Sequence, residues 1–339
     1  TKKRSANSAW QPLTSATSAV SDAGMVLDEF SRGHTSKRNM TRSFHIFAII
    51  LLIAAGQAFA QSKTELRRQI EQVVAGKKAT VGVAIADSDG KVAASLNGDR
   101  RFPMQSVFKL HIGLKMLSEI DKGRFSLDQK IEISKSDLLP DLYSPIRDRY
   151  PEGATLSLAE ILGYTISASD NVGCELLLKL LGGPAEIERY FVERGFRDVS
   201  IKVNEVVMQA NWDRQFENWT TPNAANKVLR AFYANDRKLL SVKSREFLWK
   251  VMRETETGAD RLKGRLPAGT VVAHKTGSSG VNKTTGVTAA VNDIGVVFLP
   301  NGRYFFISVF VTDSTEDAAA NEKIIADIAR AAWDHFVKK

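Results

Sequence analysis

The amino-acid sequence predicts an α+β fold in which an antiparallel sheet, flanked by helices, is formed by strands from both ends of the chain. Two apolar stretches near the start, 81–86 and 91–96, are separated by Asp87-Ser88-Asp89-Gly90, a combination typical of a β-hairpin. Three more alternating apolar stretches occur near the end, at 271–276, 288–298 and 304–311. Helical patterns fill the region between the two groups. The sequence therefore predicts an all-helical subdomain inserted into the sheet.

The expected elements follow in order. Apolar residues at helical spacing, Leu66, Ile70, Val73 and Val74, predict a first helix at 63–75. This helix and the hairpin form a sheet part at about 61–100. The helical part, at about 101–257, begins with an apolar helix at 102–117, for which Pro103 marks the entry.

A loop-rich stretch to about residue 151 comes next. Further helices are expected at 156–168, 171–182, 184–194, 221–234, 241–253 and 258–264. Residues 196–220 have little periodicity and predict a long ordered loop, a type of segment that is often functional. The second sheet part, at about 258–339, contains the hairpin turn Asn301-Gly302 and ends in a helix at about 316–337.

The N-terminal 60 residues are expected to lie outside the folded domain. Residues 1–39 are rich in Ser, Ala, Thr and Lys and predict disorder or sequence upstream of the true start. Residues 40–60 combine basic residues, an apolar core and Ala58-Phe59-Ala60, which is typical of a secretory signal peptide cleaved after Ala60. An uncleaved anchor is the weaker alternative, because the apolar run is shorter than a membrane span. We therefore expect a periplasmic catalytic domain at 61–339 without stable membrane association after cleavage.

Composition excludes several classes of function. The net charge is +9, partly carried by the first 60 residues, and no basic run is interleaved with aromatic residues, so nucleic-acid binding is not expected. Cys174 is the only cysteine; it lies in an apolar run and predicts buried packing, with a thiol nucleophile as the less favoured reading. Beyond the signal peptide, His111, His274 and His335 lack the spacing of zinc ligands. No metal and no cofactor is expected.

A serine and a lysine near the start of the helix expected at 102–117 are the first candidate site residues. Ser106 and Lys109 are three residues apart, which places both side chains on one helical face. At a helix N-terminus, free backbone N–H groups favour developing negative charge. The pair predicts an activated nucleophile. The alternative, a capping serine beside a solvated lysine, is favoured if the motif stands alone.

Three further motifs lie downstream. Ser169-Asp170-Asn171 lies between two helical patterns, Asn204-Glu205 lies in the long loop, and Lys275-Thr276-Gly277-Ser278 ends a strand. Each has a plain structural explanation: a helix N-cap, a solvated acid and a turn, respectively. Their occurrence together with Ser106 and Lys109, in this order and at these spacings, indicates one catalytic site.

These motifs resemble those of the class A serine β-lactamases, in the superfamily of penicillin-recognising enzymes, from about Leu66 to the C-terminus. Four longer matches resemble the VEB- and PER-type extended-spectrum branch: Phe-Pro-Met-Gln-Ser-Val-Phe-Lys at 102–109, Asn-Glu-x-x-Met at 204–208, Arg-Leu-Lys-Gly at 261–264 and Val-Ala-His-Lys-Thr-Gly at 272–277. The resemblance implies a β-lactamase/transpeptidase-like fold. It also implies a monomer that hydrolyses penicillins and cephalosporins, including extended-spectrum cephalosporins, and confers β-lactam resistance.

The resemblance also assigns roles. Ser106 would attack the lactam carbonyl, with the oxyanion between the N–H groups of Ser106 and Ser278. Either Lys109 or Glu205 would accept the serine proton, and Glu205 would activate the water that hydrolyses the acyl-enzyme. Ser169, assisted by Lys275, would protonate the lactam nitrogen. The remaining implied roles are substrate contacts: Asn171 with the side-chain amide, and Thr276, Gly277 and Ser278 with the carboxylate region.

The long loop departs from the family pattern. Val206 replaces the usual proline after the glutamate, and a non-proline cis bond costs about 2.5–4 kcal/mol, so we expect a trans Glu205–Val206 bond. Val203 and Asn218 occupy the positions of the usual Arg–Asp pair. We therefore expect a rearranged loop and a wider cavity for bulky cephalosporin side chains.

Three substitutions affect the predicted substrate contacts. Gln209 replaces the family's water-holding asparagine. No arginine occurs at 281–295, so Arg261 is the candidate carboxylate ligand, with an exposed arginine as the alternative. Tyr143 matches the aromatic wall of the site, with loop packing as the alternative.

Two other functions share part of this motif set. A DD-peptidase of the same superfamily would keep Ser106, Lys109, Ser169 and Lys275, but it would lack the deacylating carboxylate that Glu205 provides. A non-catalytic β-lactam sensor domain usually sits on a membrane anchor, whereas residues 40–60 predict a cleavable signal. Both alternatives are therefore less favoured than a β-lactamase.

Overall fold

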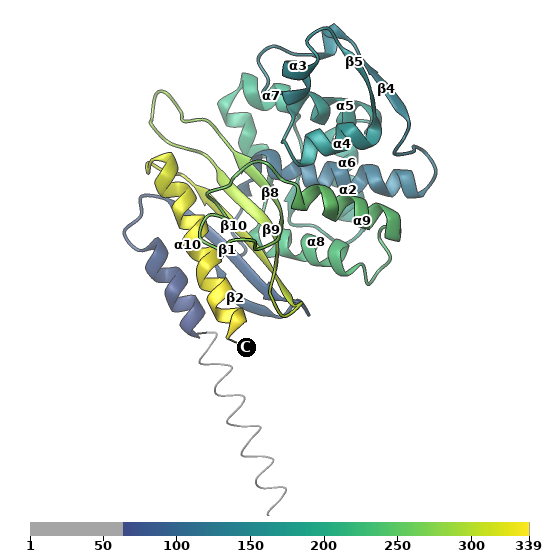
Figure 1. Ribbon diagram of the computed structural model, residues 1–339. Helices are drawn as coiled ribbons and strands as arrows, with labels where there is room; N and C mark the ends of the chain where they lie inside the picture. The colour runs from purple at the N-terminus through teal and green to yellow at the C-terminus, as the bar shows by residue number, and fades with distance from the viewer. Residues whose placement is uncertain (1–63, 339) are drawn as a thin grey trace, which may run out of the picture. The chain divides into compact units, whose positions relative to one another are not determined.

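The computed structural model describes residues 64–338 and contains a five-stranded antiparallel sheet with the order β2-β1-β10-β9-β8 (Figure 1). The predictions for residues 1–39 and for the signal peptide at 40–60 lie outside the described residues. The strands come from both ends of the described chain: β1 Thr80–Asp87, β2 Val92–Leu96, β8 Val272–Ser278, β9 Val291–Phe298 and β10 Tyr304–Thr312. The predicted α+β class is therefore confirmed, as is the hairpin turn at Gly90, whose N–H donates to Asp87 O at 2.9 Å.

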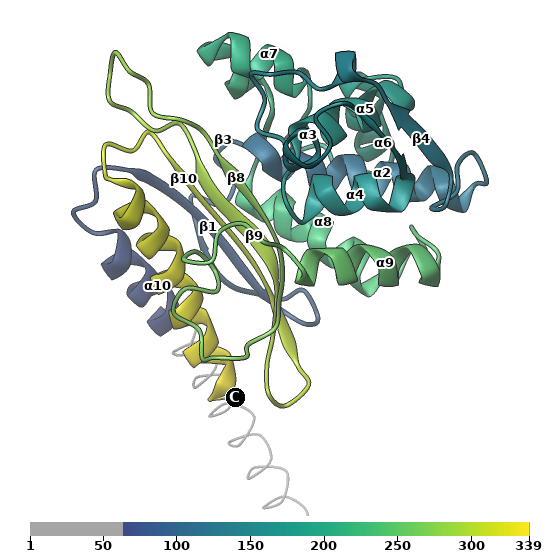
Figure 2. The ribbon, with the colours of Figure 1, turned by 45° about the horizontal axis from the view of Figure 1, so that its top comes forward.

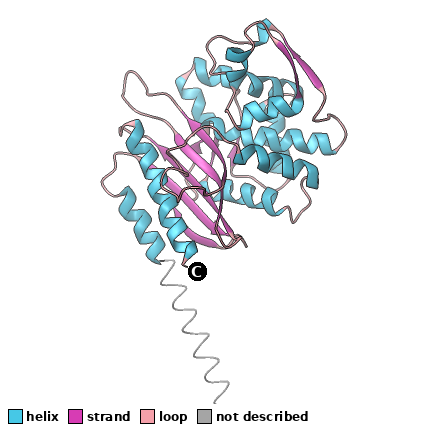
Figure 3. Ribbon diagram, in the orientation of Figure 1, coloured by secondary structure: helices cyan, strands magenta, loops and turns pink. Residues whose placement is uncertain are grey.

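Helices cover both faces of this sheet (Figures 2 and 3). Residues 64–74 and α10 (Ala318–Val337) pack on one face, and α8 (Pro222–Ala234) and the rest of the helical part lie on the other. The side chains of β10 alternate between two cores, as strand geometry requires. Phe305, Ile307 and Val309 belong to the core under α10, whereas Phe306 and Phe310 belong to the core of the helical part.

Helix α2 (Phe108–Asp121) is the centre of the helical part. It is buried on nearly all sides, including the side chains of Lys109 and Glu119, and it contacts α4, α5, α6 and α9. Burial on all sides is typical of a helix inside a large core. Besides α8, the other α-helices of this part are α3 Pro145–Arg149, α4 Leu158–Ile166, α5 Asn171–Leu181, α6 Pro184–Glu193, α7 Glu205–Ala210 and α9 Val242–Arg253.

The start of α2 differs from the prediction of a helix at 102–117. Phe102–Pro103 forms the short strand β3, and Gln105–Val107 forms the 3₁₀ turn η1, so the α-helix begins only at Phe108. Met104 N donates to Asn218 O at 2.8 Å, and Gln105 has a left-handed φ of 46°. Contacts with a distant segment therefore hold the chain out of helical geometry just before Ser106, and no local pattern encodes such contacts.

Residues 196–220 were predicted as one long ordered loop, but the structure has short helices and strands there. They contain β6 (Val199–Ser200), α7, the 3₁₀ helix η3 (Trp212–Glu217) and β7 (Trp219–Thr220), and β7 lies between β3 and β6 in a small sheet. Elements this short do not produce a detectable hydrophobic period. We call residues 199–220 the Glu205 segment below.

Two other stretches also differ from the prediction. The loop-rich region before residue 151 contains β4 (Lys130–Ile133), which pairs with β5 (Ala154–Ser157), and the 3₁₀ helix η2 (Lys135–Asp137). Residues 258–264, predicted as a helix, form consecutive turns. Gly258 begins them with φ 72°, a left-handed conformation that does not start a helix.

Candidate active site

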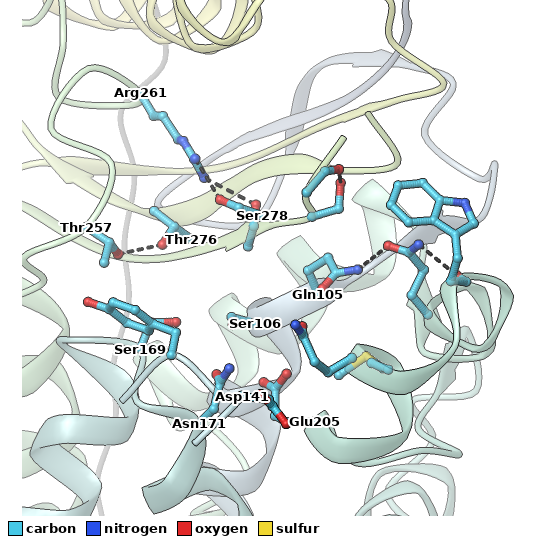
Figure 4. A pocket seen from close by; sticks show the side chains of 18 residues that line it. Gln105, Ser106, Asp141, Ser169, Asn171, Glu205, Thr257, Arg261, Thr276 and Ser278 are labelled. Atoms are coloured by element: carbon cyan, nitrogen blue, oxygen red, sulfur yellow. Dashed lines mark hydrogen bonds between the residues drawn. The ribbon is translucent and has the colours of Figure 1, made fainter. Parts of the chain in front are cut away.

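A cavity of about 710 Å³ lies between strand β8 and the helical part. Figure 4 shows Arg261, Thr276 and Ser278 on the sheet side, and Ser169, Asn171 and Glu205 on the opposite side, with Ser106 between them. Ten predicted site residues line it: Ser106, Tyr143, Ser169, Asn171, Glu205, Gln209, Arg261, Thr276, Gly277 and Ser278. The other two, Lys109 and Lys275, are fully buried against it. The structure thus brings all of the predicted residues to one place.

Lys109 connects the nucleophile candidate to the glutamate. Its Nζ donates to Ser106 Oγ at 2.8 Å and forms an ion pair with Glu205 Oε1 at 2.8 Å. It also donates to Ser169 O at 2.8 Å and to Asn171 Oδ1. A buried ammonium needs such partners to remain charged. Ser106 Oγ and the Glu205 carboxylate are therefore linked through one amine.

Lys275 contacts the second serine of the site, Ser169. Its Nζ donates to Ser169 Oγ at 2.9 Å and to Thr276 O at 3.0 Å. Burial, followed by the nearby positive charge of Lys109, holds the pKa of Lys275 well below its usual range. Ser169 itself has a left-handed φ of 61°. This arrangement places a hydroxyl between an amine and the cavity, where it can pass on a proton.

Asp170 holds the Ser169–Asn171 turn in this conformation. Its buried carboxylate caps α5 by accepting from Gly173 N at 2.7 Å. It also accepts from Ser144 Oγ at 2.8 Å and from Ile146 N at 2.7 Å. Burial raises the pKa of Asp170 above its usual value, and the opposite effect of these donors does not cancel the rise. Asp170 therefore joins α3 and α5 on the side of the cavity where Asn171 lies.

Glu205 is the first residue of α7, and a second carboxylate supports it. Asn204 caps the helix by accepting from Val207 N at 3.0 Å. The carboxylate of Glu175, on α5, accepts from Glu205 N at 2.7 Å and from Asn204 Nδ2 at 2.8 Å. Burial raises the pKa of Glu175, and the charge of Glu205 adds to this effect. Glu175 was not predicted from the sequence; its only signal is that it is the one acid in the apolar run at 172–178.

The side-chain amide of Asn218, and not an ion pair, holds the two ends of the Glu205 segment together. Asn218 Oδ1 accepts from Lys202 N at 2.7 Å and from Val203 N at 3.1 Å, and its Nδ2 donates to Val203 O at 2.8 Å. No peptide bond within residues 64–338 is cis, so the predicted trans Glu205–Val206 bond is confirmed. Residues at the two usual ion-pair positions, Val203 and Asn218, therefore still meet, with different chemistry.

Arg261 lies beneath the β8 end of the cavity. It is only 8% exposed, which excludes the alternative of a solvated arginine. Its Nη2 donates to Ser278 Oγ at 2.7 Å, and its Nη1 donates to Asn292 O at 3.0 Å. Nearby, the hydroxyls of Thr257 and Thr276 are 2.5 Å apart. A guanidinium and three hydroxyls thus form the sheet side of the cavity, as a carboxylate ligand requires.

The rim of the cavity is formed by more exposed side chains. Tyr143 is 57% exposed, and its carbonyl accepts from Asn171 N at 3.1 Å. Gln209 is exposed on α7. Gln105 was not predicted from the sequence; its Nε2 donates to Gln215 Oε1 at 2.5 Å and so joins the residue before Ser106 to η3. Seven other lining residues were not predicted either: Asp141, Met208, Trp212, Gln215, Thr257, Ser279 and Gly280.

Residues 64–338 offer neither a metal site nor a membrane-spanning helix. No group of three or more His, Cys, Asp or Glu side chains in this part of the chain is arranged to hold a metal ion. Among the described helices, none combines the length and apolar character needed to cross a membrane. Cys174 is buried, and burial raises the pKa of its thiol well above the usual range.

The sheet with its inserted helical part, and the meeting of Ser106, Lys109, Ser169 and Lys275, define a serine enzyme of the penicillin-recognising class. Comparison with known proteins agrees. A family model described as "Beta-lactamase enzyme family" matches residues 65–336. The chain belongs to this family, as a class A β-lactamase of the VEB/PER type, and is a β-lactam hydrolase.

The individual relatives cover nearly the whole described chain. Beta-lactamase VEB-1 of Pseudomonas aeruginosa is 49% identical over 295 residues, covering 87% of this chain and 98% of VEB-1. The extended-spectrum β-lactamase PER-1 of the same organism is 41% identical over 297 residues, covering 87% of this chain and 95% of PER-1. The crystal structure of TLA-1 extended-spectrum β-lactamase matches with a TM-score of 0.78 at 45% identity, covering 81% of this chain and 99% of TLA-1.

Proposed function

We propose that the enzyme opens the β-lactam ring through an acyl-enzyme on Ser106. The observation that carries the proposal is the contact chain from Ser106 Oγ through Lys109 Nζ to Glu205 Oε1, with 2.8 Å at each step. Transfer of one ammonium proton from Lys109 to Glu205 leaves an amine that can accept the hydroxyl proton as Ser106 attacks the carbonyl. Both groups thus share the role of base in acylation.

Collapse of the tetrahedral intermediate breaks the lactam C–N bond. Ser169 would give its proton to the departing nitrogen and recover one from Lys275, whose lowered pKa favours release. The backbone N–H groups of Ser106 and Ser278 would stabilise the oxyanion. After acylation Lys109 is again an ammonium, so the extra proton on Glu205 would pass through water to Lys275, which gave one up. The Glu205 carboxylate would then take a proton from a water molecule that attacks the ester, and that proton would pass to the departing Ser106 oxygen. Gln209, on the same helix, would help hold that water.

Replacement of Glu205 tests whether deacylation can be slowed while acylation of Ser106 continues. We expect Glu205→Gln to slow deacylation by about 10²–10⁴-fold, the usual contribution of a general base. With nitrocefin, a burst of one equivalent should precede slow turnover, and mass spectrometry should find the acyl adduct on the intact protein. Ser106→Ala should give neither burst nor adduct. Undiminished turnover in Glu205→Gln would remove Glu205 from the mechanism.

We further propose that the substrates are penicillins and cephalosporins, including those with bulky extended-spectrum side chains. The wide cavity and the exposed Tyr143 at its rim support room for such side chains, and the position of Asn171 suits the substrate's side-chain amide. The carboxylate of the substrate would contact Ser278 and Thr276 and be attracted by Arg261.

Arg261→Gln tests the carboxylate contact. It should lower kcat/KM by about 10–100-fold, the range for loss of a charged hydrogen bond. The control is Arg265→Gln: Arg265 lies four positions along and pairs with Asp327 outside the cavity. Equal kcat/KM in Arg261→Gln and the unmodified enzyme would assign the carboxylate to other groups.

A further inference from the structure

A second cavity, of about 510 Å³, lies away from the catalytic one and shares no lining residue with it. It is bounded by α8, α9, β10 and the turn between β1 and β2, elements that meet on the lower side of the molecule in Figure 2. Its lining consists of Ser88, Asp89, Arg230, Tyr233, Ala234, Asp236, Arg245, Glu246, Trp249, Arg253 and Tyr304. None of these residues takes part in the mechanism proposed above.

Aromatic rings form one wall of this cavity. The ring centroids of Tyr233 and Trp249 are 4.9 Å apart, and those of Tyr233 and Tyr304 are 4.7 Å apart, both in edge-to-face geometry. We call these three residues the aromatic wall. Such packing fixes the rings against their neighbours. The partly exposed rings of Tyr233 and Tyr304 offer a preformed surface to a flat ligand, and the buried Trp249 lies against Tyr233.

Hydrogen-bond donors without acceptors accompany the aromatic wall. The indole N–H of Trp249 is buried and has no hydrogen-bond partner, which is costly unless a ligand or water supplies one. The hydroxyls of Tyr233 and Tyr304 likewise make no hydrogen bond to another residue in the described part of the chain. Because these two side chains are partly exposed, water can reach their hydroxyls, and the indole N–H is the buried donor of the wall that lacks a partner.

Two arginines on α9 add positive charge. Arg245, Trp249 and Arg253 follow each other at intervals of four residues and so share one face of the helix. Within residues 64–338, neither arginine forms an ion pair: Arg245 contacts only the carbonyl of Tyr233, at 3.4 Å, and Arg253 lies over the Phe298 ring at 5.6 Å. Both guanidinium groups are thus free to bind an anion.

The carboxylates of the lining do not neutralise these two arginines. Asp236 is paired with Arg230 at 3.1 Å, and Arg230 Nε also donates to Asp89 O at 3.2 Å. Asp89 and Glu246 are exposed residues of the lining, and within residues 64–338 neither forms an ion pair with Arg245 or Arg253. The lining therefore contains two arginines that no carboxylate of the described chain pairs with.

We propose that this cavity is a second binding site, selective for aromatic carboxylates. The ring of the ligand would stack on the aromatic wall, and its carboxylate would accept hydrogen bonds from Arg245 or Arg253 and from the indole N–H of Trp249. Arginine suits this role because its planar group binds carboxylates through two parallel hydrogen bonds. The assignment is independent of the reaction at Ser106.

The test is a calorimetric titration of the intact mature enzyme with 2-naphthoate and with its neutral isostere 2-naphthamide. The acid should bind, and the amide should bind at least 10-fold more weakly. Arg245→Gln and Arg253→Gln should each weaken 2-naphthoate about 10-fold or more, the range for a lost charged hydrogen bond. Trp249→Phe keeps an aromatic ring but removes the donor, and should weaken binding about 3–10-fold.

Controls distinguish this site from the catalytic one. Arg237→Gln, an exposed arginine between α8 and α9 that is not in the lining, should leave the affinity for 2-naphthoate unchanged. Arg261→Gln should also leave it unchanged, and 2-naphthoate should not compete with nitrocefin. Because Arg245→Lys and Arg253→Lys retain the charge without the planar group, they should show intermediate affinity.

Several results would overturn the proposal. These are the absence of binding, equal affinity for acid and amide, full affinity in both Arg245→Gln and Arg253→Gln, or loss of binding in Arg261→Gln together with competition against nitrocefin. Near-UV circular dichroism and nitrocefin turnover establish that each variant is folded, since none of the lining residues contacts Ser106. If a glutamine variant does not fold, the corresponding lysine variant tests the loss of the planar group, and its full affinity for 2-naphthoate would equally contradict the proposal.

Discussion

At the level of single residues, the site contains two buried lysines with different surroundings. Lys109 contacts a carboxylate directly, whereas Lys275 has only neutral oxygens of Ser169 and Thr276 as hydrogen-bond acceptors. Taking an ammonium group out of water is unfavourable unless an opposite charge lies close by. Burial therefore holds the pKa of Lys275 well below its usual range, in keeping with the position that it occupies behind Ser169.

Glu175 is the residue whose replacement tests how Glu205 is held. In Glu175→Ala, Glu205 N and Asn204 Nδ2 lose their acceptor, and a lost partner of a buried group costs about 1–3 kcal/mol. We expect deacylation to slow more than acylation, because Glu205 alone acts in the second step. Pre-steady-state nitrocefin kinetics measure both rates.

Glu188→Ala is a matched control for this prediction. The Glu188 carboxylate also supports the Glu205 segment, by accepting from Ile201 N at 2.9 Å, but it lies outside the catalytic cavity. It should lower the melting temperature and leave the ratio of the two rates unchanged. An equal change of both rates in Glu175→Ala would mean that Glu175 stabilises the fold without positioning Glu205.

At the level of elements, the amide of Asn218 replaces the expected ion pair and closes the Glu205 segment. The side chain acts as acceptor and donor at once, which a carboxylate cannot do. Asn218→Asp would restore the residue type usual in the family, but without an arginine partner. Its second oxygen would then face Val203 O, where Asn218 now donates a hydrogen bond.

We therefore expect Asn218→Asp to lower the free energy of unfolding by about 1–3 kcal/mol, the cost of an unsatisfied buried polar group. Urea denaturation measures this change. Asn211→Asp is the control, because Asn211 caps η3 at the surface through its side-chain oxygen alone, a contact that aspartate retains. Unchanged stability in Asn218→Asp would show that the donor half of the amide is dispensable.

Helix α2 contains a group that should make the fold sensitive to acid. His111 is fully buried, and its ring packs edge-on against Phe191 of α6 with centroids 4.7 Å apart. Burial lowers the pKa of His111 from 6.5 to about 4. Between these two values the unfolded chain binds a proton that the folded chain does not, so stability is complete above about pH 6.5 and falls as the pH drops toward 4.

The loss should reach about 3 kcal/mol at pH 4, from 1.36 kcal/mol for each pH unit. His111→Leu should flatten this part of the curve of unfolding free energy against pH. Leu117→Val, a buried change on the same helix without a titrating group, should lower stability equally at pH 5 and pH 7. The same slope in His111→Leu as in the unmodified chain would assign the acid sensitivity to carboxylates.

At the level of the whole molecule, long periodic segments were predictable and contact-dependent ones were not. The strands β1, β9 and β10 and the helix α10 have strong hydrophobic patterns, and they appear close to the predicted positions. The 3₁₀ turn at Ser106 and the short elements of the Glu205 segment depend on contacts between distant residues, such as Met104 with Asn218. The order and spacing of the motifs predicted the catalytic candidates as one site. The role of Glu175, a lone acid in an apolar run, and that of Gln215 followed only from their contacts in the structure.

The proposed signal peptide determines where the mature chain begins. If residues 40–60 are a signal peptide cleaved after Ala60, the mature enzyme begins at Gln61, shortly before the helix at 64–74. Intact-mass analysis of the periplasmic fraction should then show a chain that starts at Gln61 and hydrolyses nitrocefin. Ala60→Phe places a large side chain at the cleavage position and should leave an unprocessed, membrane-retained form.

Gln57→Ser is the control. Gln57 lies in the same segment but is not one of the two alanines of Ala58-Phe59-Ala60, so this variant should be processed normally. Because every residue that lines the catalytic cavity follows residue 100, removal of the first 60 residues should leave kcat unchanged. A fully processed Ala60→Phe variant, or a mature chain that still contains the apolar run at 46–55, would place the cleavage elsewhere.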